Sequence, residues 1–198
     1  MKAITVHLQR FAPLYGWVNR LLRVDLSNGT ISATPLDGYV PDYIGGRGVA
    51  ARLAWDEYPE PVDPFAPESP LIIMTGALTG TRSPYSGRTS ISGFSPQAYP
   101  YNWYTRANIG HHWGAELKRA GYDGILVTGA SDTPVQLVIR DDEVTLAPAD
   151  DLWGLDTYDT QEALRAQVSK EVRALVIGPA GERLSRIATI HTGTSSTA

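Results

Sequence analysis

The 198-residue sequence contains no cysteine. A chain without thiols cannot form a disulfide, supply a cysteine nucleophile or ligate an iron–sulfur cluster. Any such centre must therefore come from another chain or segment. The four histidines show neither the i, i+4 pairing nor the neighbouring carboxylates of a zinc site, so no metal site within this chain is predicted.

Long apolar runs and basic clusters are also missing. No apolar stretch approaches the roughly 20 residues that a membrane-spanning helix needs, and the first residues lack the apolar core of a signal peptide. The formal net charge is -4, and no run of Lys or Arg offers counterion release to a nucleic acid. These absences predict a cytoplasmic protein without a membrane or nucleic-acid partner. They do not exclude a small anionic ligand that is bound by a few arginines.

What the sequence does contain is typical of a globular domain, with 42% apolar and 19% charged residues. Residues 1–15 show no period and are predicted to be a loose leader. From Gly16 onward, two alternating runs surround Asn28-Gly29, a pair that favours the type I′ turn of a β-hairpin. Helical spacing follows over residues 43–58, behind a lead-in rich in glycine.

Short apolar runs and glycine-rich loops alternate along the rest of the chain. Strands are predicted at 71–74, from Arg88 onward, and at 124–129, 134–140 and 143–148. A short helix over 111–121 ends at Gly121, and another over 161–172 follows a capping box of Asp159 and Glu162. A strand, a glycine loop and a strand close the chain over 173–190, a faint repeat of 71–84.

The sequence does not fully match either of two common catalytic motifs, the P-loop and the serine hydrolase elbow. Residues 76–83, GALTGTRS, have three residues between the glycines where a P-loop needs four, and Arg82 stands where the lysine belongs. Pro84 and a strand follow instead of the required helix. The sequence also lacks the G-x-S-x-G elbow of a serine hydrolase. Both the nucleotide P-loop and the Ser-His-Asp site are therefore disfavoured.

Two places suit an anionic ligand better. Arg88 begins a strand after the small-residue loop SPYSG, where its guanidinium has room to fork onto a phosphate or carboxylate. Asn108 and Gly110 immediately precede the predicted helix, whose unpaired N–H groups and positive dipole end attract anions. The competing interpretations are a surface salt bridge for Arg88 and a plain N-cap for Asn108.

Six segments in series resemble the N-terminal domain of the tungsten-containing aldehyde ferredoxin oxidoreductases. They are GWVNRLLRVDLSNGTI, YIGGRGVAARL, residues 63–96, ANIGHHWGAELKRAGYDGILVTGAS, DLWGLDT and VIGPAGERLSRIATI. The resemblance implies an α+β fold of two β-sheets with pseudo-two-fold duplication and a few short helices. It implies that this domain occupies residues 16–192 and that residues 193–198 are a truncated tail.

The resemblance also implies a function. In the family this domain is the base on which a tungsten bis-pterin cofactor rests, and later domains carry the cysteines of a [4Fe-4S] cluster. We expect an N-terminal domain, fragment or subunit of a tungsten or molybdenum enzyme that oxidises aldehydes to acids with ferredoxin as electron acceptor, inactive by itself. Residues 45–48 would shape the adjoining helix entry, and no catalytic residue is predicted. The implied cofactor contacts are Gly87, Arg88, Asn108, Ile109, Gly110 and His111.

The sequence departs from the family pattern at two neighbouring places. His111 and His112 follow ANIG where the family usually has a glycine, and they are either donors beside the pterin or exposed polar residues. The loop AYPYNWYTR is longer and more aromatic than usual, and it is expected to reshape the cofactor or substrate side.

The expected partners are the remaining cysteine-bearing domains or subunit of the enzyme and ferredoxin, and a homo-oligomer is left open. Two other functions also stay open. One is a stand-alone binding or assembly module without redox activity, and the other is part of an enzyme of the same family that reduces aromatic acyl thioesters.

Overall fold

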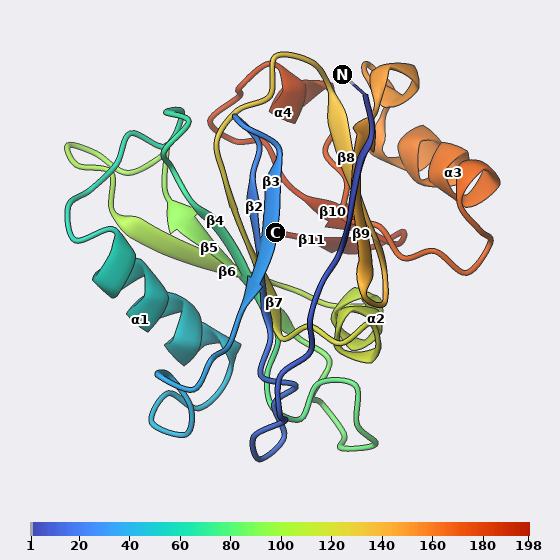
Figure 1. The fold of residues 1–198 in the computed structure, drawn as a ribbon. Coiled ribbons are helices and arrows are strands. Elements are labelled where there is room, and N and C mark those ends of the chain that lie inside the picture. The colour runs from blue at the N-terminus through green and yellow to red at the C-terminus, as the bar shows by residue number, and fades with distance from the viewer. Residues whose placement is uncertain (1) are drawn as a thin grey trace.

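The computed structural model describes residues 2–198 and is built around a six-stranded mixed sheet in the order β3-β2-β7-β4-β5-β6 (Figure 1). All neighbouring strands are antiparallel except the parallel pair β2–β7. The strands are β2 (Leu21–Asp25), β3 (Thr30–Thr34), β4 (Leu71–Met74), β5 (Thr89–Phe94), β6 (Tyr104–Ile109) and β7 (Gly124–Thr128).

A second sheet of three strands, in the order β1-β9-β8, packs against one face of the first. Its strands are β1 (Ile4–His7), β8 (Val135–Arg140) and β9 (Glu143–Pro148), and a small hairpin joins β10 (His191–Thr192) to β11 (Ser196–Thr197). The helices are α1 (Gly46–Glu57), α2 (Trp113–Arg119), α3 (Thr157–Gln167) and α4 (Pro179–Glu182), with a 3-10 turn at Asp150–Leu152. The predicted α+β class with two main sheets and short helices is confirmed.

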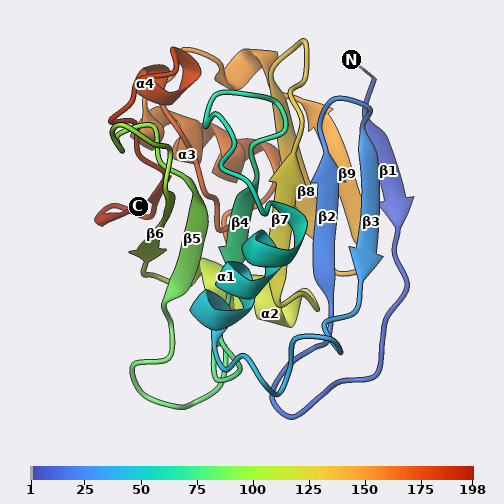
Figure 2. The ribbon, with the colours of Figure 1, turned by 90° about the vertical axis from the view of Figure 1, so that its left-hand side faces the viewer.

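Two apolar cores lie on opposite faces of the large sheet. Helix α1 covers one face, as Figure 2 shows, and its buried Val49 and Leu53 pack with Ile72 and Met74 of β4. The other core lies between the sheets, where Ile73 and its neighbours meet the small sheet and α2. Each fully buried aliphatic side chain of this kind stabilises the fold by ~1.5–3 kcal/mol. The second core comprises Leu22, Val24, Ile31, Ile73, Ile91, Ile109, Leu117, Tyr122, Ile125, Val144 and Leu146.

The N-terminal segment is part of the small sheet. Ile4 of β1 lies opposite Leu146 of β9, and His7 lies opposite Glu143. The prediction of a loose leader over residues 1–15 is therefore wrong for residues 4–7, while Met1 lies outside the described residues. Four residues are too few to show a period, although Val6 packs against the core between the sheets.

The predicted hairpin forms, but its turn is longer than the sequence indicates. Because Asp25 pairs with Thr30, four residues connect β2 and β3, and only Gly29 of them has a positive φ, of 70°. The Asp25 carboxylate accepts hydrogen bonds from the Ser27 N–H (2.9 Å) and the Asn28 amide (2.8 Å). These contacts favour an Asp-capped loop over the predicted type I′ turn.

Two predictions near the C-terminus are wrong. Helix α3 begins at Thr157 because Asp156 is its N-cap, accepting from the N–H groups of Tyr158 (2.8 Å) and Asp159 (2.9 Å), so the capping box predicted at Asp159 does not form. The two strands predicted over 173–190 are replaced by a single bridge between Val176 and His191. Pro179 opens α4 between them, because its fixed φ suits the first turn of a helix.

In residues 2–198 no helix combines the length and the apolar composition required to cross a bilayer.

Candidate functional site

The β5–β6 hairpin brings the predicted site residues together. Thr89 lies opposite Ile109 and Ser90 opposite Asn108, so the flanking Arg88 and Gly110 meet at the same end of the ladder. A Cβ atom built on Gly110 would be 3.9 Å from Arg88 Nη1. The segments 87–88 and 108–111 therefore line one end of the hairpin, although Arg88 and Asn108 are 20 positions apart in the sequence.

Arg88 presents an exposed positive charge at this end. It forms no ion pair within residues 2–198, so the surface salt bridge weighed for it is absent there. The loop that precedes it is held by its own hydrogen bonds, from Thr79 Oγ1 to the Ser86 carbonyl (2.9 Å) and from Ser86 Oγ to the Ser83 carbonyl (2.8 Å). The guanidinium can therefore fork onto a phosphate or carboxylate without breaking an existing ion pair.

Asn108 is a strand residue rather than a helix cap. It belongs to β6, its side chain is exposed, and α2 begins only at Trp113 with His112 as N-cap. Both the N-cap interpretation and the placement of Asn108 directly before a helix are therefore wrong. Pairing with β5, which is distant in the sequence, extends the strand through residue 109 and delays the start of the helix. The case for an anion then depends on Arg88 and on the backbone rather than on a helix dipole.

Ile109 and His111 differ sharply in what they can contribute. The Ile109 side chain is fully buried in the core between the sheets, so only its backbone can reach a ligand. His111 is exposed and has a φ of 63°, a conformation that glycine adopts without strain. Its Nε2 atom lies 3.2 Å from the hydroxyl of Ser195, within hydrogen-bond distance.

The C-terminal tail completes the site, which the sequence did not predict. The Gly110 N–H donates to Ser196 Oγ (2.7 Å), and Gln161 of α3 donates to the Gly193 carbonyl (3.1 Å). Ala198 pairs with Ile190 through two backbone bonds of 2.8 and 2.9 Å. The run of hydroxyl residues after His191 is the only sequence signal for this contribution, and it is a weak one.

The aromatic loop of residues 95–103 lies at the opposite end of the hairpin, beyond the pair Phe94–Tyr104 (Figure 2). Tyr99 and Trp103 are 92% and 61% exposed, and Gln97 donates to the Arg186 carbonyl (3.0 Å). The loop therefore does not reshape the side that carries Arg88, because the full length of β5 and β6 separates the two ends. That it reshapes the substrate side stays a prediction.

The glycine-rich entry to α1 packs against the end of β4. Gly45 is the N-cap with a φ of 82°, and a Cβ atom on Gly46 would lie 2.5 Å from the Thr75 carbonyl oxygen. Only glycine permits this approach, so the segment shapes the helix entry as expected. Within residues 2–198, no cluster of His, Cys, Asp and Glu side chains is arranged to hold a metal ion.

Comparison with known proteins identifies the family of this α+β domain. A family model described as the aldehyde ferredoxin oxidoreductase N-terminal domain matches residues 21–198. The chain belongs to the aldehyde ferredoxin oxidoreductase family.

Three relatives indicate the range of this family. The tungsten-containing aldehyde ferredoxin oxidoreductases of Pyrococcus furiosus and Thermococcus kodakarensis are each 40% identical over 179 residues, which is 89% of this chain and 29% of theirs. An aliphatic sulfonate oxidoreductase WOR-like subunit of Pyrococcus furiosus is 33% identical over 197 residues, which is 90% of this chain and 31% of that subunit. The chain therefore spans about 29% of the length of the tungsten-containing relatives.

A solved structure has the same fold. The active-site complex BamBC of benzoyl coenzyme A reductase, bound to 1,5-dienoyl-CoA, superposes with a TM-score of 0.87 at 34% sequence identity. The match covers 93% of this chain and 28% of that one.

Proposed function

We propose that this chain is the cofactor-binding N-terminal domain of a tungsten or molybdenum pterin oxidoreductase that oxidises aldehydes to carboxylic acids and passes the electrons to ferredoxin. One observation carries the proposal. An exposed arginine without an ion-pair partner in residues 2–198 lies beside the backbone of Gly110, in a family whose relatives include tungsten enzymes.

The residues at this end of β5 and β6 fit the phosphate part of a pterin cofactor. A guanidinium offers paired N–H donors that match phosphate oxygens, and such charge-assisted bonds are stronger than neutral ones. The Gly110 backbone lies close to Arg88 and to the tail, since a Cβ atom there would be 3.9 Å from Arg88 Nη1 and 3.3 Å from Ser196 Oγ. When bound, the metal pterin supplies the two-electron chemistry, and the protein positions it.

Each residue would have a distinct task. Arg88 would neutralise and orient a phosphate, and the exposed amide of Asn108 offers both a donor and an acceptor for the pterin. The Gly110 N–H, now bonded to Ser196, would be available to the cofactor once the hydroxyl turns to a new partner. Gly87 and His111 would contribute through the backbone and the imidazole ring, and Ile109 through its backbone alone.

The remaining parts of the enzyme would come from outside these residues. Because the sequence has no cysteine, a [4Fe-4S] cluster requires ligands from further domains or from a separate subunit. The relatives are more than three times as long as this chain, which leaves room for such domains. The 198 residues by themselves would then bind or position a cofactor without turning over an aldehyde.

A reductase of aromatic acyl thioesters is the second candidate. The specific observation in its favour is the TM-score of 0.87 with the active-site complex of benzoyl coenzyme A reductase. Both candidates use the same site, and they differ in the substrate and in the direction of electron flow.

The test is to co-express the chain with the remaining, cysteine-bearing part of a family enzyme, and to measure tungsten, molybdenum, pterin and iron in the purified complex. Aldehyde-dependent reduction of ferredoxin supports the first candidate. Reduction of an aromatic acyl thioester by reduced ferredoxin supports the second. A complex that contains neither metal nor pterin would contradict both and favour a stand-alone binding or assembly module.

A further inference from the structure

Arg106 lies on the face of the large sheet that α1 covers. Side chains alternate between the two faces along a strand, so Tyr104, Arg106 and Asn108 share one face of β6. Tyr104 packs against the core that contains the buried residues of α1, which Figure 2 shows in front of the sheet. Arg106 therefore lies on the side of α1 and not on the side of the core between the sheets.

The first turn of α1 brings Arg47 to the same face. A Cβ atom on Gly46 would lie 2.6 Å from the Met74 carbonyl oxygen, so the helix begins directly over the end of β4. Met74 pairs with Ser90, and Ser90 pairs with Asn108. Because neighbouring strands are about 4.8 Å apart, β6 lies only roughly 10 Å from β4. The start of α1 is therefore close to the side chains that β6 presents.

Tyr104 is near both guanidinium groups. Burial raises the pKa of its hydroxyl, and the positive charges of Arg106 and Arg47 oppose this rise. A charge has such an effect only over a short distance. The two arginines therefore act on the same hydroxyl, in agreement with the arrangement of β6 and α1.

No carboxylate balances these two arginines. The sequence has no acidic residue between Glu68 and Glu116, and the first turn of α1 has none either. Among residues 2–198, Arg47 and Arg106 are exposed and neither forms an ion pair. The N-terminus of α1 adds a partial positive charge. Since like charges repel each other, this arrangement is unfavourable until an anion binds to it.

A phosphate group suits the two arginines best. Each guanidinium presents paired N–H donors that match phosphate oxygens, and the two together balance the charge of a phosphate dianion. A carboxylate carries a single charge and would leave one arginine unbalanced. The free backbone N–H groups in the first turn of a helix also favour phosphate.

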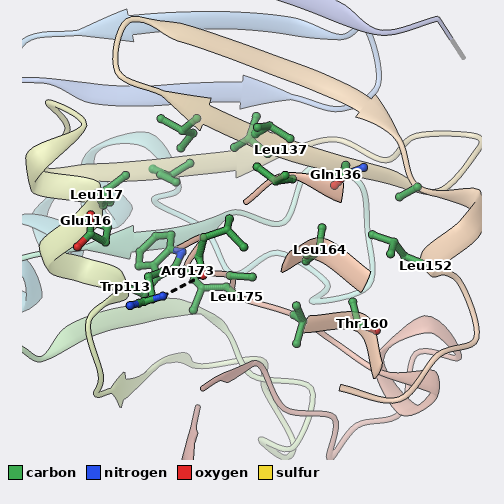
Figure 3. A pocket seen from close by; sticks show the side chains of 18 of the residues that line it. Trp113, Glu116, Leu117, Gln136, Leu137, Leu152, Thr160, Leu164, Arg173 and Leu175 are labelled. Carbon is green, nitrogen blue, oxygen red and sulfur yellow. Dashed lines mark hydrogen bonds between the residues drawn. The ribbon is translucent and has the colours of Figure 1, made fainter. Parts of the chain in front are cut away.

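We propose that Arg47 and Arg106 form a second phosphate-binding site, on the α1 face of the large sheet, for a phosphate-bearing small molecule. The phosphate belongs either to the cofactor, which would then be bound both here and at Arg88, or to a phosphorylated substrate. Phosphate binding itself does not depend on the proposed function, whereas its use in an enzyme rests on it. The site is separate from the apolar cavity shown in Figure 3, because neither arginine lines that cavity.

The test is a titration of inorganic phosphate into the purified 198-residue chain, at an ionic strength held constant with chloride and followed by amide chemical shifts. We expect saturable shifts at residues 45–48 and 104–108. Arg47→Gln and Arg106→Gln should each weaken binding by at least about tenfold, because charge-assisted hydrogen bonds are lost. Arg165→Gln removes the same charge from an exposed position on α3 and should bind phosphate as wild type does.

Arg88→Gln separates this site from the proposed cofactor site, because it should leave the shifts at residues 45–48 in place. The proposal is overturned if phosphate gives no saturable shifts there, or if Arg47→Gln and Arg106→Gln bind phosphate as tightly as wild type, with circular dichroism verifying the fold. Neither result affects the cofactor site at Arg88, which is tested by metal and pterin content.

In the co-expressed complex, Arg106→Gln identifies the source of the phosphate. A pterin content below that of wild type means that the cofactor supplies it. Wild-type pterin content means that a substrate supplies it, provided that the wild-type complex binds inorganic phosphate in a calorimetric titration and the Arg106→Gln complex binds it at least about tenfold more weakly. Wild-type pterin content without this difference in phosphate binding would overturn the proposal.

Discussion

The backbone N–H of Gly110 donates a hydrogen bond to the hydroxyl of Ser196, with 2.7 Å between N and Oγ. The two residues are 86 positions apart. The bond ties the C-terminal hairpin to the end of β6, at the place where Arg88 presents its charge. A tail that the sequence indicated to be a truncated end therefore packs against the proposed cofactor site.

Replacing Ser196 by Ala should release the Gly110 amide. Loss of one neutral hydrogen bond is worth ~1 kcal/mol, so exchange of this amide hydrogen with solvent should become about fivefold faster. Amide hydrogen exchange followed by NMR measures the rate directly. Thr197→Ala, next to it on β11 but exposed, should leave the rate unchanged. Equal rates in wild type and Ser196→Ala would show that the hairpin does not hold this amide.

Gly114 allows α2 to pack closely on the strand that follows Arg88. A Cβ atom at Gly114 would lie 2.2 Å from Thr89 Oγ1, and Thr89 is fully buried. Gly114→Ala should therefore lower the free energy of unfolding by ~1–3 kcal/mol, as overpacking of a core does. Urea denaturation at pH 7 measures this loss.

The matched control is Gly38→Ala, because a Cβ atom there meets nothing within 4 Å. Its effect on the free energy of unfolding should stay within ~0.5 kcal/mol. If the two variants had the same stability, close packing of α2 on β5 would be ruled out.

Asp123 anchors α2 to the start of β2 through a buried carboxylate. Its oxygens accept from the N–H groups of Val18 and Arg20, both at 3.0 Å, and from Lys118 Nζ at 2.5 Å. Removing one partner of a buried ion pair leaves the other charge unpaired, so Asp123→Ala should cost ~3–5 kcal/mol of unfolding free energy.

The exposed pair of Glu116 and Arg119 on the same helix provides the comparison. Glu116→Gln should cost less than ~1 kcal/mol, because exposed ion pairs are screened by solvent. Chemical denaturation of both variants at pH 7 gives the two values. A loss at Asp123 as small as that at Glu116 would contradict the anchoring role.

Asp142 makes the free energy of unfolding depend on pH in the acidic range. A hydrogen bond from Arg10, at 2.8 Å, lowers the pKa of the Asp142 carboxyl, with a further contribution from Arg20 at 2.7 Å and an opposing effect of burial. Because the folded pKa is lower than the unfolded pKa, this group contributes stability above the unfolded pKa of about 3.9. The contribution is lost as the pH falls through the folded value.

The stability difference between wild type and Asp142→Asn should therefore be constant from pH 7 to about 5 and should shrink below about pH 4. Urea denaturation across this range is the measurement. Asp132→Asn, an exposed carboxylate in the turn before β8, should follow the wild-type curve. A difference that grows on acidification would have the wrong sign for a lowered pKa.

The sequence predicted those elements whose signals are local. The buried run at β4 was placed at its observed residues, and Gly121 ends α2 with the expected positive φ, of 91°. The strand predicted from Arg88 onward begins one residue later, at Thr89. In each case a short apolar run or a glycine within the segment itself is the signal.

Features that depend on distant partners were missed. Asn108 looked like a helix cap because the residues after it are helical, but pairing with Ser90 makes it part of a strand. The tail has only a weak local signal for folding over Gly110, its run of hydroxyl residues, because the partner of Ser196 is 86 positions away.

The central claim, that Arg88 holds the cofactor, is tested most directly by metal analysis of the co-expressed complex. Tungsten, molybdenum and pterin are measured per complex in wild type, Arg88→Ala and Arg165→Ala, an exposed arginine of α3 away from the site. Loss of charge-assisted hydrogen bonds worth ~1.5–3 kcal/mol should weaken retention roughly 10- to 100-fold in Arg88→Ala, with wild-type content in Arg165→Ala. Wild-type metal and pterin content in Arg88→Ala would contradict the account.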